Sequence, residues 1–139
     1  MLEPRMLFAG AAALTALTAA VLSARRRYVV VVVRGQSMRP TLANGDRLLV
    51  RRTSPERFKV GQIIVFEAPG VRLEGDPAWR IKRVAAVAGD PGFDGGTVPP
   101  GRVVVCGDNE RSATSEQLGY VAVESVLGTA DPRFRLTSG

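Results

Sequence analysis

Residues 28–42 of the chain, YVVVVVRGQSMRPTL, contain the transition that decides its fold. The run from Tyr28 to Val33 is short and almost entirely valine, so it favours a strand over a continuation of the apolar segment before it. Gly35 ends this strand, and Pro40 stops regular structure soon afterwards. The stretch therefore predicts a strand that ends beside the hydroxyl of Ser37, although an ordinary Gly/Ser/Pro turn has the same local pattern.

Further strand-forming segments follow along the chain, and turn sequences separate them. They lie at 47–51, 62–68, 79–88, 102–106 and 126–130. The sequences between them are rich in Gly, Pro, Asn and Asp, which are the usual turn residues. Short strands at this spacing predict a mainly β fold, a small antiparallel β-sheet domain over residues 28–130. Residues 131–139 are expected to form a loose tail.

An uncharged apolar segment, Met6–Ala24, precedes this domain. Its 19 residues span about 28 Å as a helix, close to the hydrocarbon thickness of a bilayer. A cleavable export signal is an alternative, but such signals have shorter apolar stretches, and Arg25–Arg27 follows directly. We therefore expect residues 1–27 to be an uncleaved N-terminal transmembrane anchor with a basic flank. By the positive-inside rule, the arginines favour a cytoplasmic location for the main domain.

The composition of the chain excludes several kinds of active site. Its 139 residues include no histidine and one cysteine, Cys106. This excludes a Ser-His-Asp triad, a Cys-His dyad, His- or Cys-ligated zinc and an internal disulfide, and we expect no metal and no cofactor. The net charge of +6 is spread along the sequence with few aromatic residues, so nucleic acid is not an expected partner. A nucleophile in this chain must be activated by a carboxylate, a lysine or an N-terminal amine.

Lysine is rare in this chain, because only Lys59 and Lys82 among its 19 basic residues are lysines. In a strand over 79–88, Lys82 shares a face with the small apolar residues Val84 and Ala86. Burial on such a face disfavours the ammonium form and lowers the pKa. A general base near neutral pH needs a fall from about 10.4 to roughly 7, which costs about 4 kcal/mol. The alternative is an ordinary strand lysine whose amine stays in water.

Four short motifs occur along the chain in a definite order. They are G-x-S-M-x-P-T-L at 35–42, Gly45-Asp46-Arg47-Leu48-Leu49-Val50, Lys82-Arg83-Val84, and Gly107-Asp108-Asn109 followed by Ser112. Together they resemble the type I signal peptidases, which are membrane-anchored serine proteases with a Ser/Lys dyad. The resemblance covers residues 28–130, and the apolar segment lies where the family has its anchor.

The resemblance implies a role for each matching residue. Ser37 is the expected nucleophile, and its backbone N–H helps to bind the oxyanion. Lys82 is the expected general base, and the hydroxyl of Ser112 orients its amine. The implied activity is removal of N-terminal signal or leader peptides from exported precursors, with cleavage after small residues. The implied partners are these precursors and membrane lipid, and the family's catalytic domain lies on the extracytoplasmic side of the cell membrane, against the charge rule.

The chain departs from the family pattern in several places. Gly35 stands where some members carry a hydroxyl that is a second oxyanion donor. The run 112–116, Ser-Ala-Thr-Ser-Glu, lacks the usual Asp and Arg, and the 24 residues at 83–106 leave no room for the large second β domain of some relatives. An inactive membrane-anchored β domain that binds signal-like peptides therefore stays open as an alternative. A self-cleaving Ser/Lys regulator needs a DNA-reading N-terminal domain, where this chain has an apolar segment.

Overall fold

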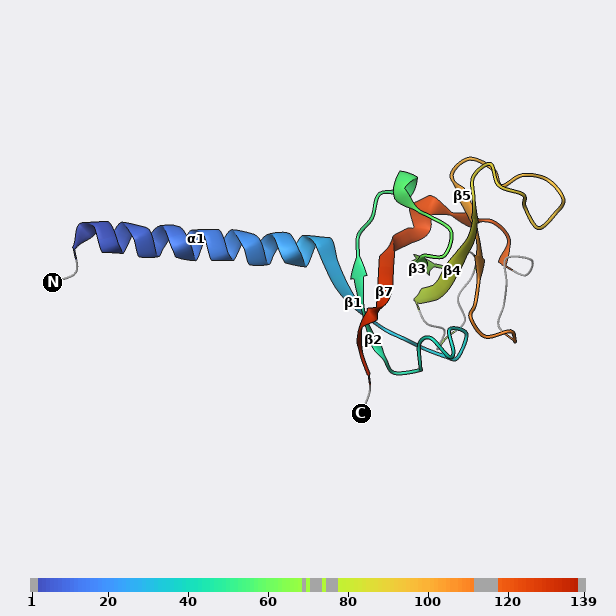
Figure 1. Cartoon of the computed structure of the whole chain (residues 1–139), viewed down its shortest axis with the longest axis horizontal. Helices are drawn as coiled ribbons and strands as arrows, with labels where there is room; N and C mark the ends of the chain where they lie inside the picture. The colour runs from blue at the N-terminus through green and yellow to red at the C-terminus, as the bar shows by residue number, and fades with distance from the viewer. Residues whose placement is uncertain (1–2, 69, 71–73, 75–77, 112–117, 138–139) are drawn as a thin grey trace.

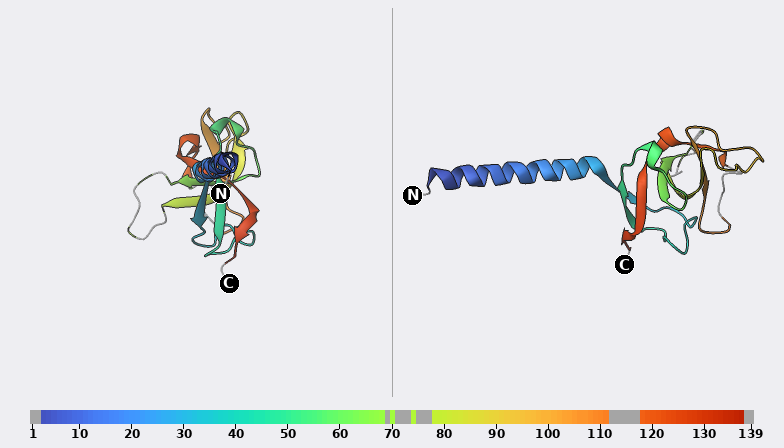
Figure 2. Two further views of the ribbon diagram at one scale, coloured as in Figure 1. Left: turned by 90° about the vertical axis from the view of Figure 1, so that its left-hand side faces the viewer. Right: turned by 45° about the horizontal axis from the view of Figure 1, so that its top comes forward.

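The computed structural model describes residues 3–68, 70, 74, 78–111 and 118–137. Within these residues the chain forms one long helix, α1 (Pro4–Arg27), and one curled antiparallel sheet (Figure 1). The predicted fold class, a mainly β antiparallel domain preceded by one apolar helix, is confirmed. The two parts form an elongated molecule, with the amino terminus at the far end of the helix (Figure 2).

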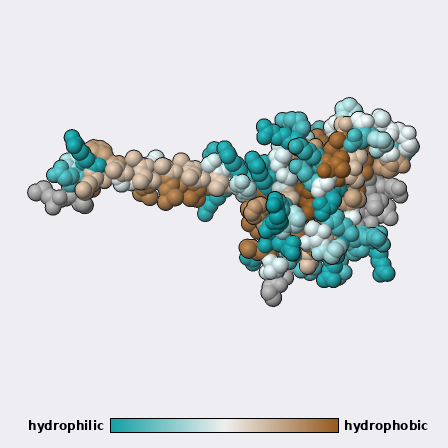
Figure 3. Space-filling view, viewed as in Figure 1, coloured by the Kyte–Doolittle hydropathy of each residue, from teal (hydrophilic) through white to brown (hydrophobic). Residues whose placement is uncertain are grey.

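The helix α1 projects away from the sheet and buries none of its residues (Figure 3). Alanine and leucine are frequent in it and favour helix, and Pro4 lies in the first turn, where its missing N–H has no intrahelical partner to lose. The helix ends at Arg27, because the valine run after it favours extended backbone. An 18-residue window of it has a mean hydropathy of 1.9, and its 24 residues reach about 36 Å, so α1 is long and apolar enough to cross a bilayer.

The sheet contains the strands that the sequence predicts and one short strand more. Its strands are β1 (Tyr28–Val32), β2 (Arg47–Arg51), β3 (Ile63–Glu67), β4 (Trp79–Val87), β5 (Arg102–Cys106), β6 (Val121–Ala122) and β7 (Val126–Leu136). Among the described residues their order in the sheet is β1-β2-β7-β3-β4-β5-β6, and neighbouring strands are antiparallel. Short 3-10 turns occur at Pro55–Arg57 and Val123–Ser125.

Two apolar cores lie on opposite faces of the curled sheet, and β3 contributes to both. Ile63 and Val65 pack in the first core, whereas Ile64 and Phe66 pack in the second. All four are at most 1% exposed. Each such burial is worth about 1.5–3 kcal/mol, and a strand covered on both faces has a continuous apolar run in its sequence. The strand β3 is therefore a fixed support for its neighbour β4.

The chain after residue 130 continues as strand β7, so the expectation of a loose tail over 131–139 is wrong as far as Leu136. Arg135 and Leu136 pair with β2, and the residues before them bulge out of the ladder. The turn-like sequence Asp131-Pro132 lies in this bulge, where a proline without an N–H is tolerated. The local sequence favours a break here, and pairing with β2 resumes beyond it.

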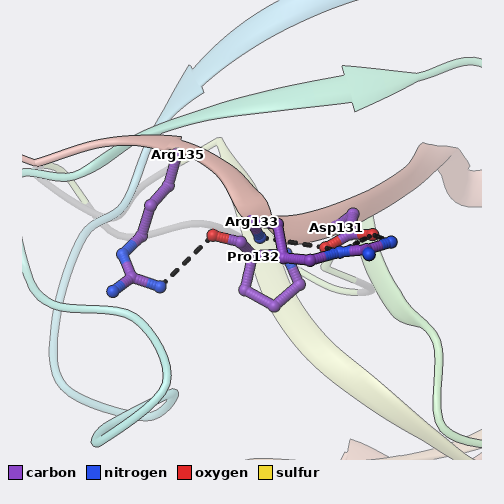
Figure 4. Close-up of polar contacts among 4 residues, drawn as sticks. All are labelled: Asp131, Pro132, Arg133 and Arg135. Carbon is purple, nitrogen blue, oxygen red and sulfur yellow. Dashed lines mark hydrogen bonds and ion pairs between the residues drawn. The ribbon is translucent and has the colours of Figure 1, made fainter.

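Side-chain contacts hold this end of β7 in place. Figure 4 shows Arg133 paired with the carboxylate of Asp131 and Arg135 donating to the carbonyl of Pro132 at 3.2 Å. The guanidinium of Arg135 also lies 3.8 Å from the carboxylate of Asp46, which is 3% exposed. Asp46 in turn accepts a hydrogen bond from the N–H of Ala43 at 2.9 Å. The end of β7 is thus tied to the segment between β1 and β2.

Removal of residues 133–139 is expected to lower the free energy of unfolding by about 1–3 kcal/mol. The deletion removes the outer pairs between β2 and β7 and leaves the buried carboxylate of Asp46 without its guanidinium partner. Thermal unfolding of the detergent-solubilised chain measures the effect. Arg133→Ala, which breaks only an exposed ion pair, is the control and should change little. An unchanged melting temperature in the truncated chain would contradict the structural role of this segment.

Candidate active site

The segment between β1 and β2 is a compact loop that carries Ser37. Gly35 has a φ of +84°, a conformation that glycine adopts without steric cost, and its N–H donates to the side-chain oxygen of Asn44 at 2.8 Å. Met38 and Leu42 are each 1% exposed and pack in the first core. The loop is therefore anchored on both of its sides, and the side chain of Ser37 is half-buried.

Lys82 lies in β4 and is 3% exposed. It pairs with Ile64 of β3 and lies in the half of β4 next to the Ser37 loop. Burial is the main cause that lowers the pKa of the Lys82 amine, and the charge of Arg80 lowers the pKa further, whereas Cys106 raises it. A lowered pKa increases the fraction of amine that is neutral near pH 7 and able to accept a proton.

One pocket of about 410 Å³ brings Ser37 and Lys82 together from distant parts of the sequence. Its other lining residues are Arg34, Gly35, Gln36, Trp79, Arg80, Ile81, Asn109 and Arg111. No hydrogen bond joins the Ser37 hydroxyl to the Lys82 amine in the described part of the chain. Catalytic hydrogen bonds are often long in a free enzyme and shorten when substrate binds. The pocket thus holds a hydroxyl and a desolvated amine, the two groups that a Ser/Lys mechanism needs.

The carboxylate of Asp108, after β5, joins the two segments that carry these groups. It accepts two hydrogen bonds from the guanidinium of Arg83, at 2.8 and 2.6 Å. It also accepts a hydrogen bond of 2.5 Å from the hydroxyl of Thr41, in the Ser37 loop. Because Arg83 directly follows Lys82 in β4, one carboxylate fixes the distance between the loop and the lysine strand. The sequence motifs contain these residues but do not show that they meet.

Asn109 holds the Ser37 loop from the other side of the pocket. Its backbone N–H donates to the carbonyl of Ser37 at 2.9 Å, and its side-chain amide donates to the carbonyl of Gln36 at 3.0 Å. Both bonds end on backbone oxygens, so they fix the loop without engaging the serine hydroxyl. Among the described residues, the N–H of Ser37 has no hydrogen-bond acceptor and remains available as a donor.

Asp108→Asn is expected to lower the free energy of unfolding at pH 7 by about 1–3 kcal/mol, because it weakens charged hydrogen bonds. The Arg83 guanidinium holds the pKa of Asp108 below its usual range. Its contribution is therefore complete above the unfolded value of about 3.9 and is lost as the pH falls through the lower folded pKa. Denaturant unfolding from pH 7 down to pH 3 should show wild type and variant converging at the acid end. A constant difference would contradict this assignment, and the more exposed Asp131→Asn is the control.

The first half of β4 has a neighbouring strand on one side only within the described structure. β3 pairs with Trp79–Arg83, whereas β5 reaches only from Val87 back to Arg83. Val84 directs its N–H and C=O toward residues 61–62, on the β3 side. Because these groups alternate along a strand, Ile81 and Trp79 direct theirs to the open edge. This edge borders the pocket and can accept an extended peptide.

A second, apolar groove of about 440 Å³ continues from this pocket along β1. Arg34 and Trp79 line both the pocket and the groove. The remaining lining residues of the groove are mainly aliphatic: Val29, Val30, Val31, Val32, Arg52, Ala78 and Leu127. The valine run that starts the domain therefore lines a groove next to the pocket that contains Ser37.

The sequence predictions for the site have different outcomes. Ser37 and Lys82 line one pocket, whereas Ser112 lies outside the described residues, so its role stays a prediction. Sequence reasoning missed Arg34, Arg80 and Arg111. The alternation of β4 puts Arg80 on the same face as Lys82 and could have identified it, but no sequence pattern connects the other two. Among the described residues, no group of acidic, Cys or His side chains could hold a metal ion.

The sequence matches the family model described as signal peptidase, peptidase S26, over residues 6–92 of 139. The matched region contains most of α1, the Ser37 loop and all of β4. The turn with Asp108 and Asn109 lies outside it. No curated protein matches the chain.

Proposed function

Since the chain belongs to the signal peptidase family, peptidase S26, we propose that it is a membrane-anchored serine endopeptidase that removes N-terminal signal or leader peptides from exported precursors. Cleavage follows small residues, typically alanine with a second small residue two positions earlier, as in the family it belongs to. The observation that carries the proposal is the shared pocket of Ser37 and Lys82, with the lysine 3% exposed and its pKa lowered.

In the proposed mechanism, neutral Lys82 accepts the proton of the Ser37 hydroxyl. The serine oxygen attacks the scissile carbonyl, and the tetrahedral intermediate collapses when the Lys82 ammonium gives its proton to the leaving amine. This step forms an ester between the signal peptide and Ser37 and releases the mature protein. Lys82, neutral again, then takes a proton from water, which attacks the ester and frees the serine. Lys82 thus gives its first proton to the leaving amine during acylation and its second proton to the oxygen of Ser37 during deacylation.

The oxyanion of each intermediate needs donors that are already in place. The free N–H of Ser37 is the proposed donor, because Asn109 fixes the backbone around it without using it. Such a donor is worth about 2.7–4 kcal/mol of transition-state stabilisation. Gly35 has no side chain to offer, so the second donor is a backbone group or water.

The substrate is proposed to bind as an added strand along the open edge of β4. Backbone groups of Ile81 and Trp79 supply the hydrogen bonds, as in other enzymes and domains that bind peptides by strand addition. The scissile bond then lies near Ser37, and the chain before or after it continues into the apolar groove along β1. In this mode the hydrogen bonds to β4 are made by the substrate backbone, whereas its side chains contact the pocket and the groove.

The proposed anchor is α1, with the β domain on the extracytoplasmic side, where precursor cleavage sites emerge. Arg25–Arg27 then lies on the outer side of the membrane, against the positive-inside rule. A reporter fused to the C-terminus and probed in intact cells measures the orientation. Protection of the reporter by the intact membrane would contradict the proposed side.

A cleavage assay tests the activity itself. The detergent-solubilised full chain is incubated with a precursor that carries an alanine-rich cleavage site, and the new N-terminus of the product is sequenced. Cleavage after the small residue supports the proposal. Binding of the precursor without cleavage, by a folded chain, would instead favour the inactive peptide-binding alternative.

Arg80→Gln is expected to shift the acidic limb of the kcat/KM profile to higher pH. The charge of Arg80 lowers the pKa of Lys82, so its removal raises that pKa, and a higher pH is then needed to reach the neutral base. The pH dependence of cleavage of a neutral peptide, measured for wild type and variant, gives the shift. Arg57→Gln, an exposed arginine far from the pocket in sequence, is the control. An unchanged limb would show that Lys82 does not titrate as the base.

A further inference from the structure

The pocket that contains Ser37 is lined by basic side chains in unusual number. Arg34, Arg80, Lys82 and Arg111 all line it, and no Asp or Glu occurs among its described lining residues. Arg34 and Arg111 are exposed, so their guanidinium groups keep their charge. The described lining of the pocket is therefore basic beside the proposed nucleophile, and it attracts a ligand of opposite charge.

Three arginines elsewhere in the described chain pair with carboxylates. Arg83 binds Asp108, Arg133 binds Asp131, and Arg135 lies near Asp46. The pocket arginines have no such partner among the described residues. Arg80 differs from the other two in that its Nε is buried and donates a hydrogen bond to no described atom. A buried donor without an acceptor costs free energy, and Arg80 also lines the pocket, where an entering carboxylate can contact its side chain.

We infer that this pocket binds a carboxylate of the substrate. The preferred precursor then carries an Asp or Glu at the second residue before the scissile bond or at one of the two residues after it, where Arg80, Arg34 and Arg111 bind it. The inference rests on the proposed function, since it takes the occupant of the pocket to be the substrate chain. A guanidinium matches a carboxylate with two parallel hydrogen bonds, which gives this recognition its geometry. A neutral amide of the same shape presents one acceptor oxygen instead of two.

A peptide carboxylate fits the pocket better than a lipid headgroup does. The same cavity contains the nucleophile and borders the open edge of β4, so a bound substrate strand passes directly beside the arginines. Side chains of residues near the scissile bond are then within reach of Arg80, which lies two residues from Lys82 on the same strand. A lipid phosphate in this position would block the edge that the substrate needs.

Paired peptides test the inference in the full-length, detergent-solubilised chain. Each pair carries a single Glu or the isosteric Gln at the second position before the scissile bond, or at the first or second position after it, on an otherwise neutral alanine-site peptide. We expect kcat/KM for the Glu peptide to exceed that for the Gln peptide about tenfold at one position at least, with the ratio falling as salt rises. Arg80→Gln and the exposed Arg111→Gln should bring the ratio toward one, and Arg57→Gln should leave it unchanged.

The outcomes separate this inference from the proposed function. If neither peptide of any pair is cleaved by the folded chain, the proposed function fails first. Equal cleavage of the Glu and Gln peptides at all three positions overturns the inference and leaves the proposed protease activity intact. A vesicle experiment gives a further outcome that overturns the inference. In it, the Glu and Gln peptides are cleaved at the same rate in phosphatidylcholine vesicles. Added phosphatidylglycerol then changes both rates equally, and Arg80→Gln removes this change. A preference for Glu that survives both Arg80→Gln and Arg111→Gln also overturns it.

Discussion

Lys82→Met is expected to abolish precursor cleavage while making the fold more stable. The amine is the proposed base, and loss of a general base lowers the rate by about 10²–10⁴-fold. Lys82 is 3% exposed, and its pKa is lowered chiefly by burial, so the folded state is penalised for holding it. Methionine has a similar unbranched shape without the amine. Relief of this penalty is expected to raise the free energy of unfolding by about 0.5–2 kcal/mol.

The pH dependence of this gain provides a further check. Because the folded pKa of Lys82 is lowered, the unfolded chain binds more protons between that value and about 10.4, so wild-type stability rises with pH in this range. The advantage of the methionine variant should therefore shrink as the pH rises toward 10.4. Lys59→Met, at the exposed position of the other lysine, is the matched control and should change neither rate nor stability. A lower free energy of unfolding for Lys82→Met would contradict the claim that burial of the amine destabilises the fold.

Ser37→Ala is expected to lower cleavage by about 10⁴–10⁶-fold, the loss expected when a nucleophile is removed. Its fold should be intact, because the loop is held through the backbone carbonyl of Ser37 and by the core residues Met38 and Leu42. Precursor binding should also persist, since the open edge of β4 is untouched. Cleavage kinetics, precursor affinity and melting temperature together distinguish a chemical effect from a structural one.

Ser54→Ala is the matched control for this substitution, because Ser54 is exposed and makes no side-chain capping bond. It should cleave at the wild-type rate. Undiminished cleavage by Ser37→Ala would remove this serine from the mechanism. Loss of binding together with loss of the melting transition would mean that the variant had unfolded, and Ser37→Thr, which keeps a hydroxyl, then separates folding from chemistry.

Most of the strands could be predicted from the sequence, because each is a short β-branched run between Gly- or Pro-rich turns. The continuous apolar run of β3 also indicates a strand covered on both faces. The position of β7 between β2 and β3 could not be predicted, since pairing between residues so distant in sequence leaves no local signal. The sequence Asp131-Pro132 led to the wrong prediction of a loose tail, because a bulge within a strand and the end of a strand have the same local sequence pattern.

The candidate site was only partly accessible from sequence. The order of the motifs identified Ser37 and Lys82, and alternation in β4 predicted an apolar environment for the lysine. The contacts of Asp108 with Arg83 and Thr41 depend on three segments meeting in space, so no single motif contains them. The arginines of the pocket could not be predicted for the same reason, because Arg34 and Arg111 line one pocket with Arg80 only in the folded sheet.

The place of β7 in the sheet has a consequence for the nascent enzyme. Ser37 follows β1 and Lys82 is in β4. The strand β7 connects β2 to β3, although it is synthesised after all of them. While β7 is still within the ribosome or the export channel, the two halves of the sheet lack their hydrogen-bonded link. We therefore expect the segments that carry Ser37 and Lys82 to be fixed relative to each other only after β7 has been synthesised.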